Sequence, residues 1–311
     1  MHVGDDVVSL EALGRALLAH GYVFSTVTPA THRRVNARPG NQIASTLAGV
    51  FGWSRPAPAS VFPADVFIAG QAAGVLLPHR SGWRSTVRAA TLNGTLLFHS
   101  AYPTSEADAV FFGPDTYRFV SALSAHLLGG QRVDRAVDIG CGAGPGAIVI
   151  ASARPRAEVI GVDINDAALR LTAVNAALAG ITNVQAVRSD LLSAVDGTFD
   201  LIVANPPYLV DPEERTYRHG GGGLGEGLSL AIAELACRRL AQGGTLLLYT
   251  GAAVVDGGDG FRGAVMPLLE AGGLEASYEE LDPDVFGEEL AEPAYSSADR
   301  IAAVLVTATR P

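Results

Sequence analysis

From Arg135 onward the chain alternates short apolar runs with stretches of helical periodicity, and this alternation constrains the fold more than any other feature. Strands that alternate with helices build a parallel sheet with helices on both faces. The expected class is therefore α/β, with a doubly wound, mostly parallel, seven-stranded sheet. Strands are predicted at 135–139, 157–162, 183–188, 199–204, 244–250, 274–281 and 300–307, and helices near 145–153, 166–179, 228–241 and 261–271.

The first hundred residues lack this alternation. Apolar positions at helical spacing predict a helix over residues 8–20, which ends at Gly21. Two apolar runs between Thr86 and Ser100 flank Asn93-Gly94, the strongest short signal for a β-hairpin. Residues 26–67 are rich in Pro, Ser and small residues and give no assignable pattern.

Composition argues against several classes of protein. The formal net charge is -10, and all 22 basic residues are Arg. Because nucleic-acid binders neutralise phosphates with basic patches, this balance argues against a nucleic-acid partner. Gly, Pro or charge interrupts every apolar run before it reaches spanning length, and the N-terminus lacks the order of a signal peptide. The distant Cys141 and Cys237 suggest neither a disulfide framework nor a zinc site, so a cytoplasmic protein without metal is expected.

The first predicted strand runs into Asp138-Ile139-Gly140-Cys141-Gly142-Ala143-Gly144-Pro145. The three glycines let the backbone turn tightly and approach a ligand, and the proline suits the first turn of a helix. We therefore expect a cofactor-binding loop. Gly142, Gly144 and Ala147 also satisfy the relaxed dinucleotide fingerprint, which leaves an NAD-dependent oxidoreductase as an alternative.

Acidic residues follow the next two strands. Asp163 stands about 20 residues after the glycine turn, the spacing of an acid that binds ribose hydroxyls. Asn165 and Asp166 are better placed to cap the next helix, which favours the ribose role for Asp163. Asp190 is suited either to accept a hydrogen bond from an adenine amino group or to cap a turn.

The fourth predicted strand runs directly into Asn205-Pro206-Pro207-Tyr208. The prolines fix φ and restrict the residue before each of them, so the strand has a rigid, extended end. Open α/β sheets bind ligands at the carboxyl ends of their strands. Asn205 is therefore a candidate site residue, and a purely structural turn is the alternative.

The order of these motifs resembles that of class I methyltransferases, which use S-adenosylmethionine. Asn-Pro-Pro-Tyr narrows the resemblance to the HemK/PrmC family of protein glutamine methyltransferases and to DNA and RNA adenine amino methyltransferases. The resemblance covers about residues 109–307. Phe112-Gly113-Pro114-Asp115-Thr116 is similar to a signature of the HemK/PrmC catalytic domain, with Gly113 where Arg is common. The first hundred residues do not resemble the helical bundle of that family.

The resemblance implies a Rossmann-like methyltransferase domain over 109–311 and a smaller, substrate-shaping domain over 1–108 that contains the hairpin. It places Asp138 near the methionine amino group, Asp163 at the ribose, and Asp190 with Leu191 at the adenine. The expected catalytic residues are Asn205, Pro206 and Tyr208, and the expected substrate contacts are Pro207, Tyr208 and Arg218. The expected S-adenosylmethionine contacts are Asp138, Gly140, Cys141, Gly142, Gly144, Asp163, Ile164, Asp190, Leu191 and Asn205.

The chemistry of methyl transfer fits these residues. A sulfonium makes its methyl group electrophilic, so the enzyme mainly has to hold the acceptor in line. Oxygens around the N–H groups of an amide or aromatic amine favour the localised lone pair that attacks. The Asn205 side chain and the Pro206 carbonyl supply such oxygens, and Tyr208 is suited to stack on a planar acceptor.

The acceptor stays open at this stage. The motifs favour a protein glutamine, the unfamiliar N-terminal region favours a small molecule, and the charge opposes a nucleobase. A cofactor-binding module without activity is a further alternative. The atom that is methylated, N, O or C, and the oligomeric state are undetermined.

Two polar segments complete the expectations. Residues 211–223 are long enough for a mobile cover, in which Arg215, Arg218 and His219 either meet an acidic group on the acceptor or face solvent. The acidic run 279–289 is expected to be a solvated edge.

Overall fold

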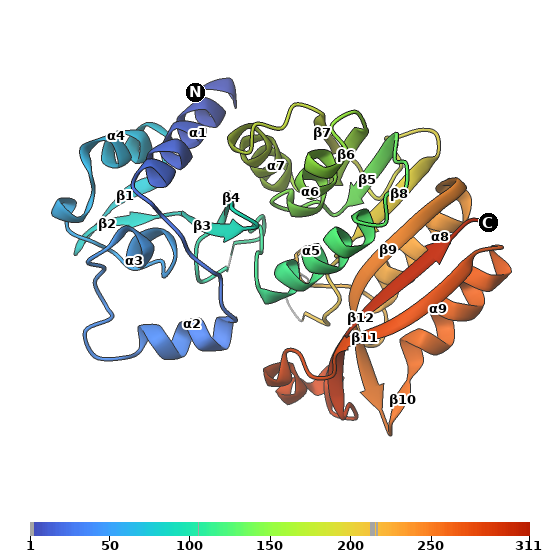
Figure 1. Ribbon diagram of the computed structural model, residues 1–311. Helices are drawn as coiled ribbons and strands as arrows, with labels where there is room; N and C mark the ends of the chain where they lie inside the picture. Colours follow the sequence, from blue (N-terminus) through green and yellow to red (C-terminus); the bar gives the residue numbers. More distant parts are fainter. Residues whose placement is uncertain (1–2, 105, 212–214, 216) are drawn as a thin grey trace.

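A computed structural model describes residues 3–104, 106–211, 215 and 217–311, with side chains from Val8 onward. In this part of the chain, the main sheet has the strand order β11-β12-β9-β8-β5-β6-β7, and the short β10 pairs with β9 (Figure 1). It therefore has one strand more than predicted. The strands are β5 (Arg135–Ile139), β6 (Glu158–Asp163), β7 (Val184–Arg188), β8 (Phe199–Ala204), β9 (Leu240–Val255), β10 (Gly258–Asp259), β11 (Glu275–Asp282) and β12 (Arg300–Thr309).

The sheet is mostly parallel, as predicted, with antiparallel strands at one side. Strands β5 to β9 pair in parallel, whereas β10, β11 and β12 pair antiparallel. Strand β9 is longer than the predicted 244–250, because β8 ends opposite Leu248 while β12 continues to pair with β9 as far as Val254.

Helices cover both faces of the sheet, which is the doubly wound arrangement. They are α5 (Pro114–Leu127), α6 (Pro145–Ala153), α7 (Asp166–Leu178), α8 (Gly227–Arg239) and α9 (Gly260–Ala271). Neighbouring strand residues face different hydrophobic clusters. Ala136 joins the cluster that contains α5, α6 and α7 residues, while Val137 joins the cluster of α8 and α9.

The N-terminal segment, residues 3–104, is a mixture of short helices and two hairpins. Its elements are α1 (Val3–Ala19), α2 (Pro29–Asn36), α3 (Leu47–Phe51), η1 (Ala59–Val61), α4 (Ala64–Ala72), β1 (Leu76–His79), β2 (Gly82–Ser85), β3 (Val87–Leu92) and β4 (Thr95–Ser100). Strands β3 and β4 pair antiparallel across Asn93 and Gly94, which both have positive φ. No described helix is long and apolar enough to cross a membrane.

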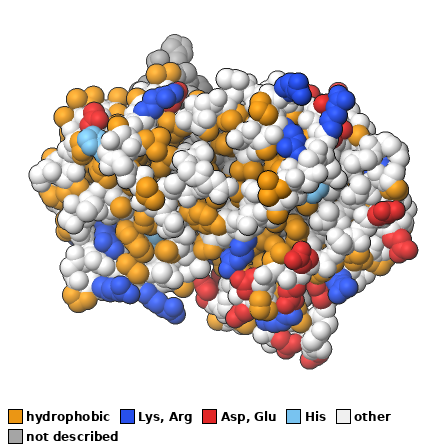
Figure 2. Space-filling view, viewed as in Figure 1, with side chains coloured by type: hydrophobic (Ala, Val, Ile, Leu, Met, Phe, Trp, Pro, Cys, Tyr) orange, Lys and Arg blue, Asp and Glu red, His pale blue; other side chains and the backbone are white. Residues whose placement is uncertain are grey.

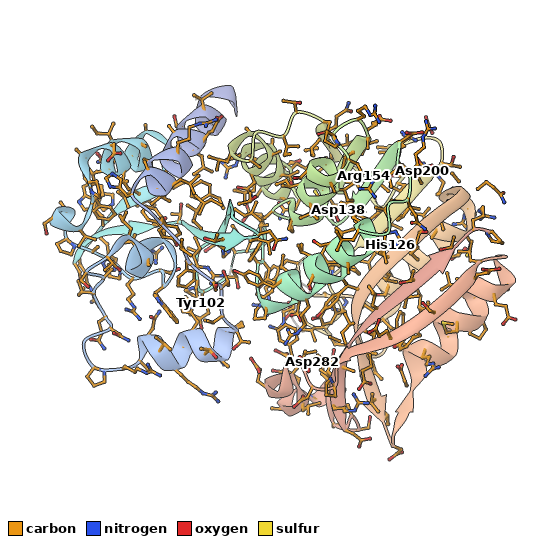
Figure 3. The ribbon with its side chains drawn as sticks, viewed as in Figure 1. Tyr102, His126, Asp138, Arg154, Asp200 and Asp282 are labelled. Carbon is orange, nitrogen blue, oxygen red and sulfur yellow. The ribbon has the colours of Figure 1, made fainter. Side chains whose placement is uncertain are left out.

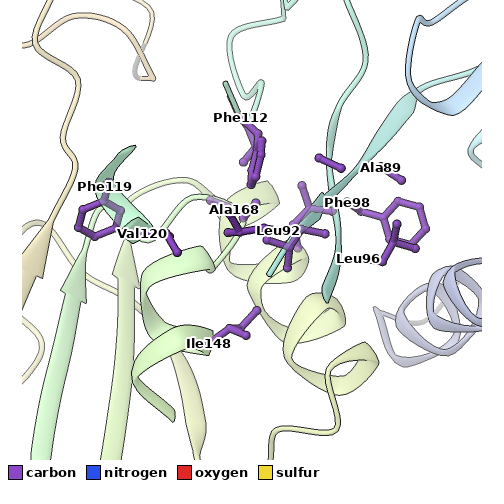
Figure 4. Close-up of a cluster of buried hydrophobic side chains, with 14 of the residues drawn as sticks. Ala89, Leu92, Leu96, Phe98, Phe112, Phe119, Val120, Ile148 and Ala168 are labelled. Atoms are coloured by element: carbon purple, nitrogen blue, oxygen red, sulfur yellow. The ribbon is translucent and has the colours of Figure 1, made fainter. Parts of the chain in front are cut away.

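The N-terminal segment packs directly on α7. A Cβ at Gly14 of α1 would lie 2.6 Å from the end of the Leu178 side chain, so the two helices are in close contact here. One hydrophobic cluster extends from β4 into α5 and α7; Phe98, Phe119 and Ala168 are among its members (Figure 4).

Asn175 is the main polar link at this contact. Its side chain is fully buried on α7, where Oδ1 accepts from Phe98 N at 2.8 Å and Nδ2 donates to Phe98 O at 3.0 Å. Nδ2 also donates to the Ala143 carbonyl at 2.8 Å. One side chain therefore ties α7 both to the β3–β4 hairpin and to the loop after β5.

Replacing Asn175 with Ala should lower the free energy of unfolding by about 3 kcal/mol, because three buried backbone groups lose their partner. Urea unfolding measures the change. Gln185→Ala, at an exposed position of β7, is the control and should change stability by less than about 0.5 kcal/mol. An equally small effect of Asn175→Ala would contradict this account of the contact.

Candidate active site

A cavity of about 550 Å³ lies at the carboxyl ends of the parallel strands. Strand β5 is where the strand order reverses, since β6 and β7 lie on one side of it and β8 and β9 on the other. Such a reversal is the usual place for a ligand in an open α/β sheet. The cavity contacts eleven of the predicted site residues: Gly140, Gly142, Asp163, Ile164, Asp190, Leu191, Asn205, Pro206, Pro207, Tyr208 and Arg218.

The loop between β5 and α6 forms one wall of the cavity. Gly140, Gly142 and Gly144 have φ values of 70°, 54° and 83°, so each needs the conformational freedom of glycine. A Cβ at Gly140 would meet no described atom within 4 Å. The loop is therefore open towards the cavity at this point, and its backbone is accessible to a ligand.

Three predicted cofactor residues do not line the cavity. Asp138 is buried beneath the loop, where its carboxylate accepts from Ala147 N at 2.9 Å and burial raises its pKa to about 7. Cys141 points its buried thiol towards Thr172 Oγ1, 3.4 Å away. Gly144 faces Thr172 as well, and its role is to begin α6 in a left-handed conformation. The predicted loop therefore borders the cavity with Gly140 and Gly142, while Asp138, Cys141 and Gly144 face the protein interior, which sequence alone did not show.

Asp163 joins the end of β6 to the glycine loop. Its Oδ2 accepts from Gly142 N at 3.0 Å, and its Oδ1 accepts from Asn165 N at 2.9 Å. Burial raises the pKa of this carboxyl group, while the two backbone N–H groups oppose that effect. Asp163 is thus a fixed acceptor on the cavity wall. Asn165 caps α7, as predicted, through its Oδ1 and Ala167 N.

The segment after β7 forms the next part of the wall. Asp190 is exposed at the cavity, and Leu191 has a φ of 49°. A left-handed conformation is unfavourable for leucine and often marks a site where the backbone has a functional task. The expected adenine contact of these two residues stays a prediction.

Asn205 follows β8 on the opposite side of β5. Its side-chain amide makes no hydrogen bond to any described residue, and the Pro206 carbonyl accepts none from the described chain. Both groups border the cavity. The Asn-Pro-Pro-Tyr segment therefore borders the cavity with polar groups that the described part of the chain does not use.

The Tyr208 ring packs against Gly251 of β9. A Cβ at Gly251 would lie 2.3 Å from the Tyr208 ring, so the ring rests on the bare backbone of the strand. The Phe286 ring centroid lies 6.0 Å away. The Tyr208 hydroxyl is buried and has no hydrogen-bond partner among the described residues.

Asp115 lines the same cavity, although the sequence analysis gave it no role of its own. It belongs to the signature before α5, and only 4% of its surface is exposed. The neighbouring Gly113 takes the place of the usual Arg, and a Cβ there would lie 2.6 Å from the Phe111 ring. The aromatic Phe111, which also lines the cavity, therefore covers this position.

Two arginines of the loop after Tyr208 have carboxylate partners, and the mobile cover expected over residues 211–223 stays a prediction. Residues 212–214 and 216 of this prediction lie outside the described residues. Arg215 binds the buried Asp211 through Nε at 2.7 Å, and it lowers the pKa of that carboxyl group. Arg218 forms an ion pair with Glu289, and its Nε lies 3.4 Å from Asp211 Oδ1. Both arginines therefore already have carboxylate partners within the fold.

The acidic run is not simply a solvated edge. Glu289 lies in η2 (Gly287–Ala291), is 6% exposed, and lines the cavity together with Glu288 and Glu292. The following η3 (Pro293–Tyr295) supplies Tyr295, whose hydroxyl accepts from Val210 N at 2.9 Å. Figure 2 shows acidic side chains gathered in the region where Figure 1 places the segment between β11 and β12.

The N-terminal segment supplies the remaining wall, which includes Arg33, Tyr102 and Thr104. Tyr102 lies above α2 (Figure 3), and its ring stacks on His32 with centroids 4.0 Å apart. Thr104 O accepts from the Tyr217 hydroxyl at 2.6 Å, which joins this wall to the loop after β8. The described residues contain no group of three or more His, Cys, Asp or Glu side chains arranged to hold a metal ion.

Comparison with known proteins agrees with this geometry. Residues 112–252 match the model of the methyltransferase small domain. The chain is 35% identical over 178 residues to the ribosomal protein uL3 glutamine methyltransferase of Xanthomonas campestris pv. campestris. The alignment covers 53% of this chain and 57% of that protein. It is 37% identical to the release factor glutamine methyltransferase of Deinococcus radiodurans, over 50% of this chain and 59% of that protein.

A relative with a small-molecule acceptor matches over a shorter region. The 4-amino-L-phenylalanine/4-methylamino-L-phenylalanine methyltransferase of Streptomyces pristinaespiralis is 32% identical, over 42% of this chain and 49% of that protein. The chain thus spans 49% to 59% of the lengths of these three relatives. Among solved structures, the M. jannaschii tRNA m1G37 methyltransferase shares the fold with a TM-score of 0.51 and 17% identity, over 75% of this chain and 59% of that one.

Gly251→Ala should lower the free energy of unfolding by about 1–3 kcal/mol, because the added methyl group overlaps the Tyr208 ring. Urea unfolding again measures the change. Gly263→Ala is the matched control, since a Cβ there meets no described atom within 4 Å and the residue lies inside α9. If both variants are as stable as the wild type, Gly251 does not support Tyr208.

Motif order, strand order and the comparisons agree on one conclusion. Residues 112–252 form a class I S-adenosylmethionine-dependent methyltransferase domain, and over this region the chain resembles the HemK/PrmC family.

Proposed function

We propose that this protein transfers a methyl group from S-adenosylmethionine to a planar or amide nitrogen, and that a protein glutamine is the acceptor. The observation that carries the proposal is the Asn205 amide at the cavity, next to the Pro206 carbonyl, neither of which has a hydrogen-bond partner among the described residues. Two oxygen acceptors at one strand end suit the two N–H groups of a primary amide.

The residues at the cavity fit the cofactor. The open backbone at Gly140 and Gly142 leaves room for its methionine part, and Asp163 offers a fixed carboxylate to ribose hydroxyls. Asp190 and Leu191 border the region assigned to the adenine. When bound, the cofactor supplies an electrophilic methyl group on a positively charged sulfur. The acidic lining, which includes Asp163, Asp190 and Asp115, suits that charge.

The protein's own task is to position the acceptor. Asn205 Oδ1 and the Pro206 carbonyl accept hydrogen bonds from the acceptor N–H groups, which orients the nitrogen and localises its lone pair. Tyr208, supported by Gly251, closes one side of the acceptor space. Residues 1–108 are proposed as the domain that shapes this space, and residues 109–311 as the catalytic domain.

Two relatives named as glutamine methyltransferases support the protein acceptor. A small aromatic amine is the second candidate, because a relative named for 4-amino-L-phenylalanine also matches and because the N-terminal segment is not a helical bundle. The acidic cavity edge opposes a nucleobase within a nucleic acid. A cytoplasmic location, which the two free cysteines suit, stays a prediction.

Asp163→Ala should weaken binding of S-adenosylhomocysteine at least about tenfold, since the ribose loses a charged hydrogen-bond acceptor. Isothermal titration calorimetry measures the affinity. Asp166→Ala, which removes an exposed carboxylate of α7, is the control and should bind as the wild type does. Absence of binding to the wild type, or equal binding by Asp163→Ala, would refute the proposed cofactor site.

Asn205→Ala should lower kcat by about 10²–10³-fold with little change in cofactor affinity, because it removes one group that orients the acceptor. The assay uses S-adenosylmethionine with a labelled methyl group and three separate acceptors: a release factor, ribosomal protein uL3 and 4-amino-L-phenylalanine. Mass spectrometry locates the added methyl group. Full activity of Asn205→Ala would exclude the role proposed for this residue.

A further inference from the structure

Asp115 is a buried carboxylate whose presence the fold alone does not explain. It occupies the first turn of α5, which lies at the centre of the molecule between the N-terminal segment and the sheet (Figure 1). Burial of a carboxylate is costly unless hydrogen bonds and charges compensate for it. Because Asp115 also borders the cavity that holds Asn205 and Tyr208, a ligand is the natural target of this group.

The two oxygens of Asp115 have different surroundings. Oδ1 accepts from the Tyr249 hydroxyl at 2.7 Å and lies 3.3 Å from Arg118 Nη1. Arg118 in turn donates to Asp282 Oδ2 at 2.7 Å, so its charge is shared between two carboxylates. Tyr249 and Arg118 thus hold Oδ1, whereas Oδ2 forms no hydrogen bond to the described residues. The Tyr208 hydroxyl lies near the same carboxyl group and helps to lower its pKa.

The third neighbour is Tyr208 of the Asn-Pro-Pro-Tyr segment. Its buried hydroxyl makes no well-formed hydrogen bond to the described residues, and it lies close enough to Asp115 for the carboxylate to raise the tyrosine pKa further above the value set by burial. Burial likewise raises the pKa of Asp115, which Tyr249, Arg118 and Tyr208 oppose. The charged and titratable groups that face Asp115 are therefore Arg118, Tyr249 and Tyr208, with Asp282 behind Arg118.

We propose that Asp115 is a catalytic residue for methyl transfer, and that its Oδ2 accepts a hydrogen bond from the acceptor nitrogen and takes its proton. The nitrogen lone pair forms the new bond to the methyl carbon as the carbon–sulfur bond breaks and its electron pair stays on sulfur. The N–H electron pair returns to nitrogen, and the proton passes to Asp115. The sulfonium charge and the Asp115 carboxylate charge are both neutralised in this step.

This role rests on the proposed methyl transfer and adds a base to it. Asn205 and Pro206 orient the acceptor from the end of β8, whereas Asp115 receives the proton from the first turn of α5. A properly placed proton acceptor typically contributes about 10²–10⁴-fold to a rate. The raised pKa of Asp115 makes its carboxylate a better base than an exposed one.

Asp115→Asn tests the proposal, because the amide keeps the shape and an oxygen for Tyr249 but accepts no proton. With whichever of the three acceptors the wild type methylates, kcat should fall at least about 100-fold while S-adenosylhomocysteine affinity stays within about threefold. In the wild type, kcat should rise with pH as Asp115 loses its proton, and this rise should be absent in Asp115→Asn. Wild-type kcat in the variant, with the rise retained, would overturn the proposal.

Tyr249→Phe gives a second test, because it should change the pH dependence of kcat only if Asp115 takes part in the reaction. The lost hydrogen bond raises the pKa of Asp115, so the rise of kcat should shift to higher pH. Carbon-13 NMR of the aspartate carboxyl groups follows the same titration in the full chain without any acceptor. An Asp115 titration that does not coincide with the rise of kcat in the wild type, or that Tyr249→Phe leaves unchanged, would also overturn the proposal.

The two proposals fail in different ways. If the wild type transfers no methyl group to any of the three acceptors, the proposed function fails. If the wild type is active and Asp115→Asn is equally active, only the role of Asp115 fails. Asn205→Ala should lower kcat and leave the Asp115 titration in place, which separates the orienting group from the base.

Discussion

The parallel pairing of β8 with β5 and β9 is the constraint on which the rest of the structure depends. It brings the end of β8, and with it Asn205, beside the glycine loop that follows β5. Because the strand order reverses there, helices leave the sheet in opposite directions and a cavity opens between them. The proposed cofactor and acceptor residues lie at one cavity because two neighbouring strands end together.

Around this constraint, other contacts fix the cavity wall. Asp163 ties the end of β6 to the glycine loop through Gly142 N, and Asn175 ties the same loop to the β3–β4 hairpin through Ala143 O and the Phe98 backbone. Arg218 and Glu289 join the loop after β8 to the segment between β11 and β12. The wall is therefore made of segments distant in sequence, each held by a few buried polar contacts.

Much of this was predictable from sequence, because local chemistry decides it. Apolar periodicity placed β5 and β8 at their observed bounds, and Asn93-Gly94 marked the turn between β3 and β4. The rigid prolines after Asn205 indicated a strand end that carries a polar group. These features depend on neighbours in the chain, and so a single sequence contains them.

Long-range partners account for what the sequence did not show. Arg218 appeared available to a substrate because its partner Glu289 lies 71 residues away, and Asp115 appeared to be only part of a motif because Tyr249 lies 134 residues away. His32 of the N-terminal segment also has a distant neighbour, the buried Arg88. Burial, together with the charge of Arg88, lowers the pKa of His32 to about 4, so this histidine is neutral at pH 7. His32 stacks on Tyr102 and thereby supports the cavity wall from a region without assignable sequence pattern.

A crystal structure of the full chain with S-adenosylhomocysteine tests the central claim most directly. The account predicts ribose hydroxyls hydrogen-bonded to Asp163, the amino acid part along Gly140 and Gly142, and the sulfur facing Asn205 with Asp115 at the same open space. Product bound elsewhere, or bound with its sulfur turned away from Asn205, would contradict the account.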